Sequence, residues 1–345
     1  MQAGAYIGEG QVGVIEVEDP GPPGRGDVLL EPAFAGVCGS DLHMVEAGFF
    51  PLNEVMGHEF SATVAALGEG VDAFAVGDRV TARPWVACGG CISCADGADS
   101  YCDDATGIGS FQGLATSSRP GGMAPRIHVP ARSLHRLPDR IGLETGALIE
   151  PLAVAWHAVR AAGLEAGDDC VILGAGPIGI ALLCAARAVG ARRVVVTEHV
   201  QARGETAGRF GADHVLVHGR DDVPGEMARL LPRGAPVVFD AVGVPGTIHE
   251  AVTFARKGGR VQIVGVCMQP DPVIPAFWLG SEPTLMISYI YSEAEFAETV
   301  ELVATGRIDA EAMITRIESM HEVSAVFDAL STSKEDVKVL LRPLR

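Results

Sequence analysis

Residues 170–190 read CVILGAGPIGIALLCAARAVG. A short apolar run, typical of a buried strand, leads through a G-x-G-x-x-G turn into an apolar helix-forming segment. In this setting Gly174 permits a tight turn, Gly176 lets a pyrophosphate approach the backbone, and Gly179 lets helix and strand pack closely. The helix N-terminus adds N–H donors and a positive dipole end. We expect the turn to bind a dinucleotide through Gly174, Gly176, Pro177, Ile178 and Gly179.

Apolar strand-like runs continue to alternate with helical stretches as far as about Pro283. The expected strands are 170–173, 193–197, 214–217, 236–241 and 260–266. Near-continuous apolar strands separated by helices indicate a parallel sheet that is covered on both faces. We expect three valines near the ends of the later strands to contact the cofactor: Val242, Val264 and Val266.

The second expected strand ends in Glu198, nineteen residues after Gly179. An acidic residue about 20 residues beyond the glycine turn binds the ribose hydroxyls in dinucleotide-binding domains. A carboxylate there also repels a 2′-phosphate, so Glu198 favours NAD over NADP. The neighbouring His199 and Arg203 are potential cations that could receive a phosphate, and NADP therefore stays open as the alternative.

The chain changes character on either side of this region. Residues before about 150 are rich in Gly, Pro and short β-branched runs such as 76–80 and 126–129, which predicts an irregular β domain. After residue 283 we expect a strand, two helices and a final strand, at 285–289, 293–304, 322–330 and 336–342. The expected fold class is α/β, with domain boundaries 1–152, 153–284 and 285–345.

Composition excludes several classes of protein. The 345 residues carry a net charge of −18 and 48% hydrophobic residues, typical of a globular chain that a nucleic acid would repel. The apolar runs are shorter than the roughly 20 residues of a membrane span, and the N-terminus lacks the features of a secretory signal. We therefore expect a cytoplasmic protein that binds neither nucleic acid nor membrane.

Four of the eight cysteines lie within fifteen positions. Four soft ligands at this spacing suit a closed tetrahedral zinc site with a structural role. An iron–sulfur cluster also takes four cysteines, but its compact motif usually has Pro after the last ligand, whereas Asp103 follows here. The expected ligands are Cys88, Cys91, Cys94 and Cys102.

A second set of metal-type residues is dispersed along the chain. Cys38 lies in GVCGSDLH, His58 and Glu59 in MGHEF, and Glu150 in LIEPLAVAWHAV. One thiolate, one imidazole and one carboxylate would be three protein ligands, the pattern of a catalytic zinc with an open position. Taken singly, each could instead be a core residue or a solvated charge.

Several motifs occur here in the order in which the zinc-dependent medium-chain dehydrogenase/reductase family has them. They are GVCGSDLH, GHEFSATVAALGEGV, CGGCISC with a later Cys, EPLAVAWHA and GAGPIG. The chain resembles that family from roughly residue 8 onward, and most of all its polyol, threonine and butanediol dehydrogenase branch. In that branch a glutamate such as Glu150 replaces a cysteine ligand.

The resemblance implies a GroES-like β catalytic domain, to which the C-terminal segment returns, and a Rossmann domain for the cofactor. It also implies that Cys38 and His58 bind the catalytic zinc and that Glu59 or Glu150, or both in turn, complete its shell. Ser40 would hydrogen-bond the substrate alcohol and His43 would pass the proton to solvent. Glu198 and Arg203 would form the adenosine pocket, although family members usually carry Asp at position 198.

The implied reaction is reversible oxidation of a secondary alcohol or vicinal diol to a ketone, with hydride transfer to NAD. Phe49, Phe50, Trp85 and Phe111 suggest an apolar lining rather than one suited to a long sugar alcohol, and the alternative is that they are core residues. A threonine- or sorbitol-type dehydrogenase is the alternative within the family, and a zinc-ribbon binding module is the alternative outside it. Family members are dimers or tetramers, so we expect a homo-oligomer.

Overall fold

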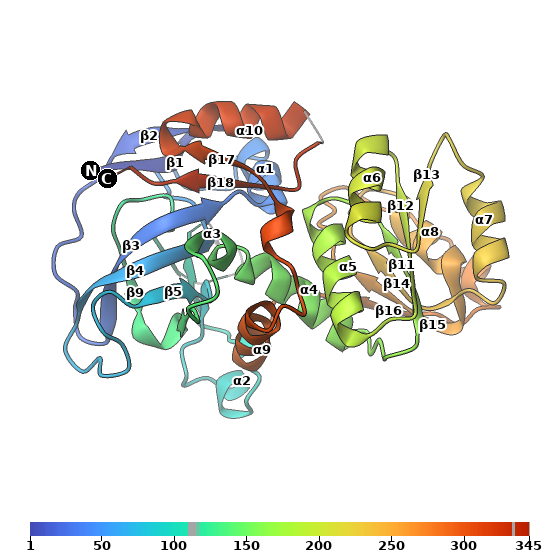
Figure 1. Cartoon of the computed structure of the whole chain (residues 1–345), viewed down its shortest axis with the longest axis horizontal. Coiled ribbons are helices and arrows are strands. Elements are labelled where there is room, and N and C mark those ends of the chain that lie inside the picture. Colours follow the sequence, from blue (N-terminus) through green and yellow to red (C-terminus); the bar gives the residue numbers. More distant parts are fainter. Residues whose placement is uncertain (110–114, 116, 333–334, 345) are drawn as a thin grey trace. The chain divides into compact units, whose positions relative to one another are not determined.

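The computed structural model describes residues 1–109, 115, 117–332 and 335–344. They divide into two compact units, one comprising Met1–Glu150 with Ser292–Arg345 and the other Pro151–Tyr291. The first unit is thus discontinuous in sequence, and the whole second unit is inserted into it. Figure 1 draws the helices and strands of both units.

The second unit contains one sheet of six parallel strands, in the order β13-β12-β11-β14-β15-β16. The strands are β11 (Asp169–Leu173), β12 (Arg193–Glu198), β13 (His214–Val217), β14 (Ala235–Asp240), β15 (Ala255–Ile263) and β16 (Thr284–Ile287). The helices are α5 (Pro177–Val189), α6 (Gln201–Arg209), α7 (Val223–Leu230), α8 (Thr247–Phe254) and the short 3₁₀ helix η3 (Pro275–Trp278). Helix α4 (Ile149–Ala161) leads into this unit.

The strand order determines where the helices pack. The chain moves outward from β11 to β13 on one side, then returns to β14 and moves outward on the other. Because crossovers between parallel strands are right-handed, the helices of the two halves cover opposite faces of the sheet. The order reverses between β11 and β14, which is where sheets of this kind bind ligands at the carboxyl ends of their strands.

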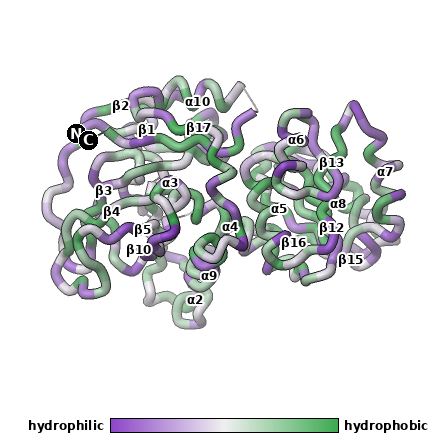
Figure 2. The backbone as a smooth tube through the Cα atoms, viewed as in Figure 1, coloured by the Kyte–Doolittle hydropathy of each residue, from purple (hydrophilic) through white to green (hydrophobic). Residues whose placement is uncertain are grey.

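The core of the second unit explains the apolar runs of the sequence. Val171, Val195, Val238 and Val261 are all completely buried at the centres of their strands. Figure 2 shows α5 as hydrophobic along most of its length, and most of its residues are buried as well. Strands that are covered on both faces need apolar residues at consecutive positions, and these strands have them.

The first unit is built around a seven-stranded sheet with the order β10-β5-β4-β3-β18-β17, in which β9 also pairs with β3. Its strands are β3 (Asp27–Gly36), β4 (Glu59–Leu67), β5 (Arg79–Ala82), β9 (Ile127–Pro130), β10 (Leu134–Arg136), β17 (Ile314–Ser319) and β18 (Lys338–Arg342). Two smaller sheets contain β1 (Gln2–Gly8) with β2 (Gln11–Glu16), and β6 (Trp85–Val86) with β7 (Thr106–Ile108) and β8 (Ser117–Arg119).

The helices of the first unit are short, apart from those near its C-terminal part. They are α1 (Gly39–Glu46), α2 (Ile92–Ala95), α3 (Leu143–Gly146), α9 (Glu293–Ala304) and α10 (Val323–Thr332). Single 3₁₀ turns are η1 (Asp99–Tyr101), η2 (Ala131–Ser133), η4 (Glu311–Met313) and η5 (Met320–Glu322). Strand β18 pairs antiparallel with β3, so two segments far apart in sequence lie side by side in one sheet.

Most predicted elements are present, and two differ for identifiable reasons. The strand expected at 76–80 begins only at Arg79, because Gly77 turns the chain with a φ of 93°. The strand expected at 260–266 begins earlier, at Ala255, and contains an irregularity: Ala235 pairs with Ala255, but Val237 pairs with Arg260. The intervening residues bulge out of the ladder.

The longest helices of the described part, α4 and α5, have 13 residues each. A helix needs roughly 20 apolar residues to cross a bilayer. No helix among the described residues meets that requirement.

Candidate functional site

Cys38, His58 and Glu59 meet at the ends of two paired strands. Strand β3 ends at Gly36 opposite Glu59, the first residue of β4, and Cys38 then caps α1. This places the thiol, imidazole and carboxylate ligand atoms within 4.8 Å of one another. Gly36 is necessary for the arrangement, because a Cβ at that position would lie 2.2 Å from a Glu59 oxygen. The sequence therefore brings three of the four dispersed candidates into one cluster.

The electrostatic environment of His58 is negative. Burial lowers its pKa, but the charges of Asp41, Cys38 and Glu150 and a hydrogen bond to Cys38 outweigh burial, so the pKa is raised well above its ordinary value. The Nδ1 atom of His58 lies 3.5 Å from an Asp41 carboxylate oxygen. Surroundings that stabilise a positive charge on a buried imidazole also suit a metal cation.

A buried lysine completes the cluster. The Lys338 ammonium donates to both Glu59 oxygens at 2.8 and 2.7 Å and to the Val37 carbonyl at 3.2 Å, and its side chain is 1% exposed. Burial lowers the pKa of Lys338, but Glu59, Cys38 and Glu150 raise it more, so the amine stays charged. Sequence reasoning missed this residue, although a lone charge in the apolar run VKVLL was a signal.

The cluster fits a zinc ion. Zinc binds thiolate at about 2.3 Å and imidazole at about 2.0–2.1 Å, so two ligands of one ion lie roughly 3.5–4 Å apart. The three ligand atoms are nearly that close already. Glu150, which is 3% exposed at the start of α4, does not belong to this compact group among the described residues, but its charge acts on His58 and Lys338.

Ser40 and His43 both lie on α1, directly after Cys38. The Ser40 hydroxyl donates to the Cys38 sulfur at 3.2 Å, so it stands beside the cluster. His43 is exposed. Within the described part of the chain no hydrogen bond joins the Ser40 and His43 side chains.

The four cysteines of the second constellation also converge. The sulfurs of Cys88, Cys91, Cys94 and Cys102 lie within 4.8 Å of one another, and those of Cys91 and Cys102 are 3.8 Å apart. That distance is the ligand separation in a tetrahedral site with zinc–sulfur bonds of about 2.3 Å. Backbone N–H groups lower the pKa of Cys91 to about 6, whereas burial raises that of Cys94 to about 12. Four adjacent thiolates need a cation, and this cluster fits zinc.

The four-cysteine loop is attached to the rest of its unit by one buried cation. Arg83, which is 2% exposed, forms an ion pair with Asp99, and the Trp85 indole donates to the Asp99 carbonyl at 3.1 Å. Arg83 also lies 3.7 Å from Glu293 of α9. These contacts fix the position of the loop, whereas all four cysteine ligands come from the loop itself.

The glycine turn has the predicted geometry. Gly174 has a φ of 90°, and a Cβ on Gly179 would lie 2.0 Å from the Gly174 carbonyl oxygen. Gly176 caps α5, Pro177 occupies the first turn, and a Cβ at Gly176 would meet only an Arg203 nitrogen, at an ordinary contact distance of 3.7 Å. The turn follows β11, the strand beside which the sheet order reverses.

Glu198 is held by backbone N–H groups around this turn. Its carboxylate accepts from Ala175 at 2.7 Å, from His199 at 2.7 Å and from Val200 at 2.9 Å. A carboxylate has about four acceptor positions, so roughly one is left for a ribose hydroxyl. Arg203 lies close by and is half-buried; burial lowers its pKa and the Glu198 charge partly offsets this.

The three predicted valines gather at the carboxyl ends of β14 and β15. The backbone N–H of Val242 donates to the Asp240 carboxylate, and that of Val264 donates to the Asp240 carbonyl. Gly243 packs against Val266, since a Cβ at Gly243 would lie 2.6 Å from the Val266 nitrogen. Asp240, which is 1% exposed, also accepts from the hydroxyl of Thr247 at 2.7 Å. Sequence reasoning missed Asp240, which fixes the backbone of this edge.

The four aromatic residues considered for the substrate lining do not form one group. Phe50 is 5% exposed and packs against Tyr6, and Trp85 is also buried. Phe49 is 56% exposed. Phe111 lies outside the described residues.

Comparisons with known proteins decide the family. Residues 24–139 match the model of the alcohol dehydrogenase GroES-like domain, and residues 177–305 that of the zinc-binding dehydrogenase. The chain is 34% identical to a 2-dehydro-3-deoxy-L-galactonate 5-dehydrogenase of Pseudoalteromonas atlantica, over 99% of this chain and 98% of the relative. The chain belongs to the zinc-dependent medium-chain dehydrogenase/reductase family.

Other members of this family are similar over their full length. The (R,R)-butanediol dehydrogenase of Bacillus subtilis is 32% identical, over 99% of this chain and 100% of the relative. The solved alcohol dehydrogenase of Thermus sp. ATN1 superposes with a TM-score of 0.90 at 28% identity, over 100% of both chains. Two similar structures were solved with NADH and with NADP.

These findings confirm the resemblance, the fold class and the class of reaction predicted from the sequence. The protein is an oxidoreductase that acts reversibly on the CH–OH group of an alcohol, with zinc and a nicotinamide cofactor. The alternative of a zinc-ribbon binding module is set aside, because both halves of the chain match dehydrogenase models.

Proposed function

We propose that the protein oxidises a secondary alcohol within a vicinal diol to the ketone, with NAD as hydride acceptor, and catalyses the reverse reduction. The observation that carries this proposal is the compact group of Cys38, His58 and Glu59. Relatives named for butanediol and sorbitol support the substrate class, because each of these compounds carries hydroxyls on adjacent carbons.

Cys38 and His58 would hold the catalytic zinc, and Glu59 or Glu150, or both in turn, would complete its shell. When bound, zinc would polarise the alcohol oxygen, and NAD would take up the hydride. Lys338 holds Glu59 in place and balances its charge beside the metal position. Cys88, Cys91, Cys94 and Cys102 would hold the structural zinc.

Ser40 and His43 would move the alcohol proton. The Ser40 hydroxyl already contacts the Cys38 sulfur and would accept the proton next to the metal position. His43 is exposed on the same helix and would pass the proton to solvent, a task that imidazole side chains commonly perform.

The cofactor would bind over the glycine turn from Gly174 to Gly179, with Val242, Val264 and Val266 along the neighbouring strand ends. Glu198 favours NAD, since its carboxylate accepts hydrogen bonds and repels a 2′-phosphate. Arg203 and His199 are the groups that would serve NADP instead.

A polyol is the second candidate substrate. Phe50 and Trp85 are core residues, so of the three described candidates for the lining Phe49 alone still supports it. Relatives named as sorbitol dehydrogenase and D-xylulose reductase favour a substrate with more hydroxyls.

The protein would act in the cytoplasm as a homo-oligomer. Strand β16 lies at the edge of the six-stranded sheet and carries Ile287, which is 80% exposed. Phe277 and Leu279, just before this strand, are 70% and 76% exposed. Unpaired strand edges with apolar residues favour pairing between copies. Light scattering of an Ile287→Lys variant would test this, and an unchanged mass would contradict it.

The experiment for the whole proposal is reduction of NAD and NADP by a panel of diols, secondary alcohols, polyols and threonine, before and after chelation. We expect turnover of a vicinal diol with NAD that chelation removes. Zinc analysis accompanies it and should find metal at both clusters. Faster turnover of a long polyol would favour the second candidate, and turnover that survives complete removal of zinc would contradict the metal assignment.

A further inference from the structure

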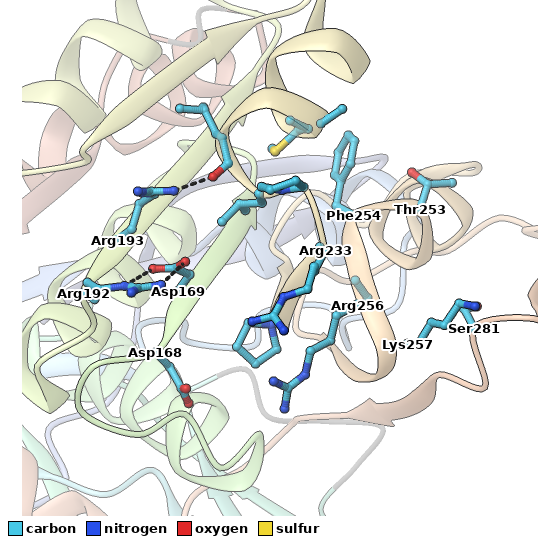
Figure 3. Close-up of a pocket in the computed structure, with 18 of the residues that line it drawn as sticks. Asp168, Asp169, Arg192, Arg193, Arg233, Thr253, Phe254, Arg256, Lys257 and Ser281 are labelled. Carbon is cyan, nitrogen blue, oxygen red and sulfur yellow. Dashed lines mark hydrogen bonds and ion pairs between the residues drawn. The ribbon is translucent and has the colours of Figure 1, made fainter.

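The second unit contains a cavity of about 1150 Å³ at the edge of its sheet opposite the glycine turn (Figure 3). Residues at the amino ends of the strands line it, among them Asp169 of β11, Arg193 of β12 and Ala255 of β15. Strand β11 has five residues, so roughly 16 Å separates this edge from the glycine turn. A ligand here would not occupy the cofactor position.

The cavity is positively charged in a chain whose net charge is −18. Its lining includes five cationic residues and two acidic ones, a net charge of +3: Arg192, Arg193, Arg233, Arg256, Lys257, Asp168 and Asp169. Both acids are engaged. Asp169 accepts from Arg192 at 2.9 and 2.7 Å, and Asp168 accepts from the Glu165 backbone at 3.1 Å.

Three of the cations have no such partner. No side-chain hydrogen bond or ion pair joins Arg233, Arg256 or Lys257 to another residue in the described part of the chain. Four other arginines of the second unit pair with carboxylates: Arg187 with Asp213, Arg192 with Asp169, Arg220 with Asp221, and Arg229 with Glu226. The cavity therefore holds three cationic side chains whose charge no carboxylate of the described residues neutralises.

The backbone fixes these cations beside one another. Gly234, the residue after Arg233, packs closely against the bulge of β15. A Cβ at Gly234 would lie 2.5 Å from the backbone nitrogen of Arg256. Gly258, with a φ of 65°, donates to the Ser281 carbonyl at 2.7 Å and closes the bulge after Lys257. Figure 3 shows the Arg233 and Arg256 side chains extending into the same part of the cavity. Bulges re-aim side chains in this way.

The cavity also has an apolar wall. Met227, Leu230 and Leu231 line it from the end of α7, and Phe254 lines it from the end of α8. The volume of about 1150 Å³ exceeds what an inorganic anion fills and lies just above the roughly 300–1,000 Å³ of sites for organic ligands. Guanidinium groups bind phosphate oxygens in a fixed two-pronged geometry.

We propose that this cavity binds an organic polyphosphate such as a nucleoside triphosphate, independently of the cofactor. Arg233, Arg256 and Lys257 bind its phosphates, and the apolar wall contacts the base. The site lies apart from the residues assigned to alcohol oxidation.

The test is calorimetric titration of the zinc-loaded protein with ATP and with inorganic tripolyphosphate, at saturating NADH so that the glycine turn is filled. We expect one site per chain, with ATP bound more tightly than tripolyphosphate and both weakened by salt. Arg233→Gln and Arg256→Gln should each weaken ATP about tenfold or more, and the double variant should abolish binding.

Arg140→Gln removes the same charge from an exposed position of the first unit and should leave the affinity unchanged. An equal loss of ATP affinity in that control would overturn the site, as would ATP binding that persists in the double variant. A fall in the fluorescence of bound NADH in proportion to the ATP bound would overturn it too, because ATP would then occupy the cofactor position. Equal affinities for ATP and tripolyphosphate would overturn the role of the apolar wall. Thermal unfolding of each variant checks that the exposed substitutions leave the fold intact.

Discussion

The two clusters of metal-type ligands in the first unit are assembled in opposite ways. Cys88, Cys91, Cys94 and Cys102 come from a single loop, and their sulfurs converge through local turns. Cys38, His58 and Glu59 converge because two strands pair, and Lys338 completes the charge balance from a third strand. A local cluster depends on its own loop, whereas an assembled cluster depends on the whole sheet. The four-cysteine cluster should tolerate substitutions outside its loop, whereas the cluster of Cys38, His58 and Glu59 should be sensitive to substitutions in distant strands.

The largest effect should come from Cys38→Ser. Removal of the thiolate should lower kcat by several orders of magnitude, because the metal that polarises the alcohol is lost or displaced. NADH binding, followed by fluorescence titration, should stay within a factor of about two, since the glycine turn lies on another unit. Cys184→Ala, which removes a thiol from α5, is the matched control. A Cys38→Ser enzyme with full kcat would refute the assignment.

Lys338→Met should cost about 3–5 kcal/mol of unfolding free energy, because it leaves the Glu59 carboxylate buried without a cation. Urea unfolding of protein stripped of zinc measures this. Restored zinc should reduce the loss, since it supplies positive charge at the same place. The double variant Lys338→Met, Glu59→Met should recover much of the stability. If the single variant is as stable as the parent, the assembled cluster does not depend on its distant strand.

Cys94→Ser tests the local cluster. We expect a loss of about 2–3 kcal/mol and a Tm lower by roughly 5–10 °C, with one zinc fewer per chain. At low temperature kcat should be nearly unchanged, because the loop supplies no ligand to Cys38, His58 and Glu59. Ser93→Ala, next to the ligand, is the control. A proportional fall in kcat would show that the two clusters are coupled.

The smallest effect concerns the attachment of the four-cysteine loop. Burial raises the pKa of Glu293, but the hydrogen bond and charge of His135 and the charge of Arg83 outweigh it and lower the pKa. A carboxyl group whose pKa is lowered in the folded protein stabilises the fold when the pH is above the ordinary glutamate pKa of about 4.3. This contribution disappears as the pH falls.

Glu293 is 49% exposed, so Glu293→Gln should cost less than about 1 kcal/mol at pH 7. The difference in Tm between variant and parent should shrink as the pH falls and vanish once the pH is below the lowered pKa of Glu293. Differential scanning calorimetry over this pH range measures it. A difference that grows towards acid pH would have the wrong sign and would exclude this role of Glu293.

The same contrast explains what could be predicted from the sequence. The spacing of Cys88 to Cys102 and the turn from Gly174 to Gly179 are local patterns, and the structure brings each set together. Lys338 was missed because its partner Glu59 is 279 residues away and only the pairing of β18 with β3 unites them. The early start of β15 was missed because the residues of a bulge do not follow the alternating hydrophobic pattern by which a strand is predicted. Phe50 and Trp85 were assigned to a lining on residue type alone, and packing places both in the core.

The distance along the chain between Glu59 and Lys338 has a consequence for biosynthesis. The whole second unit is made between them, and at about 5–20 residues per second a sequence separation of 279 residues corresponds to roughly 14–56 s of synthesis. During that time the nascent first unit carries a metal-type cluster with an uncompensated carboxylate and an unfilled place in its sheet. The cofactor unit is therefore synthesised before the catalytic cluster gains the positive charge of Lys338.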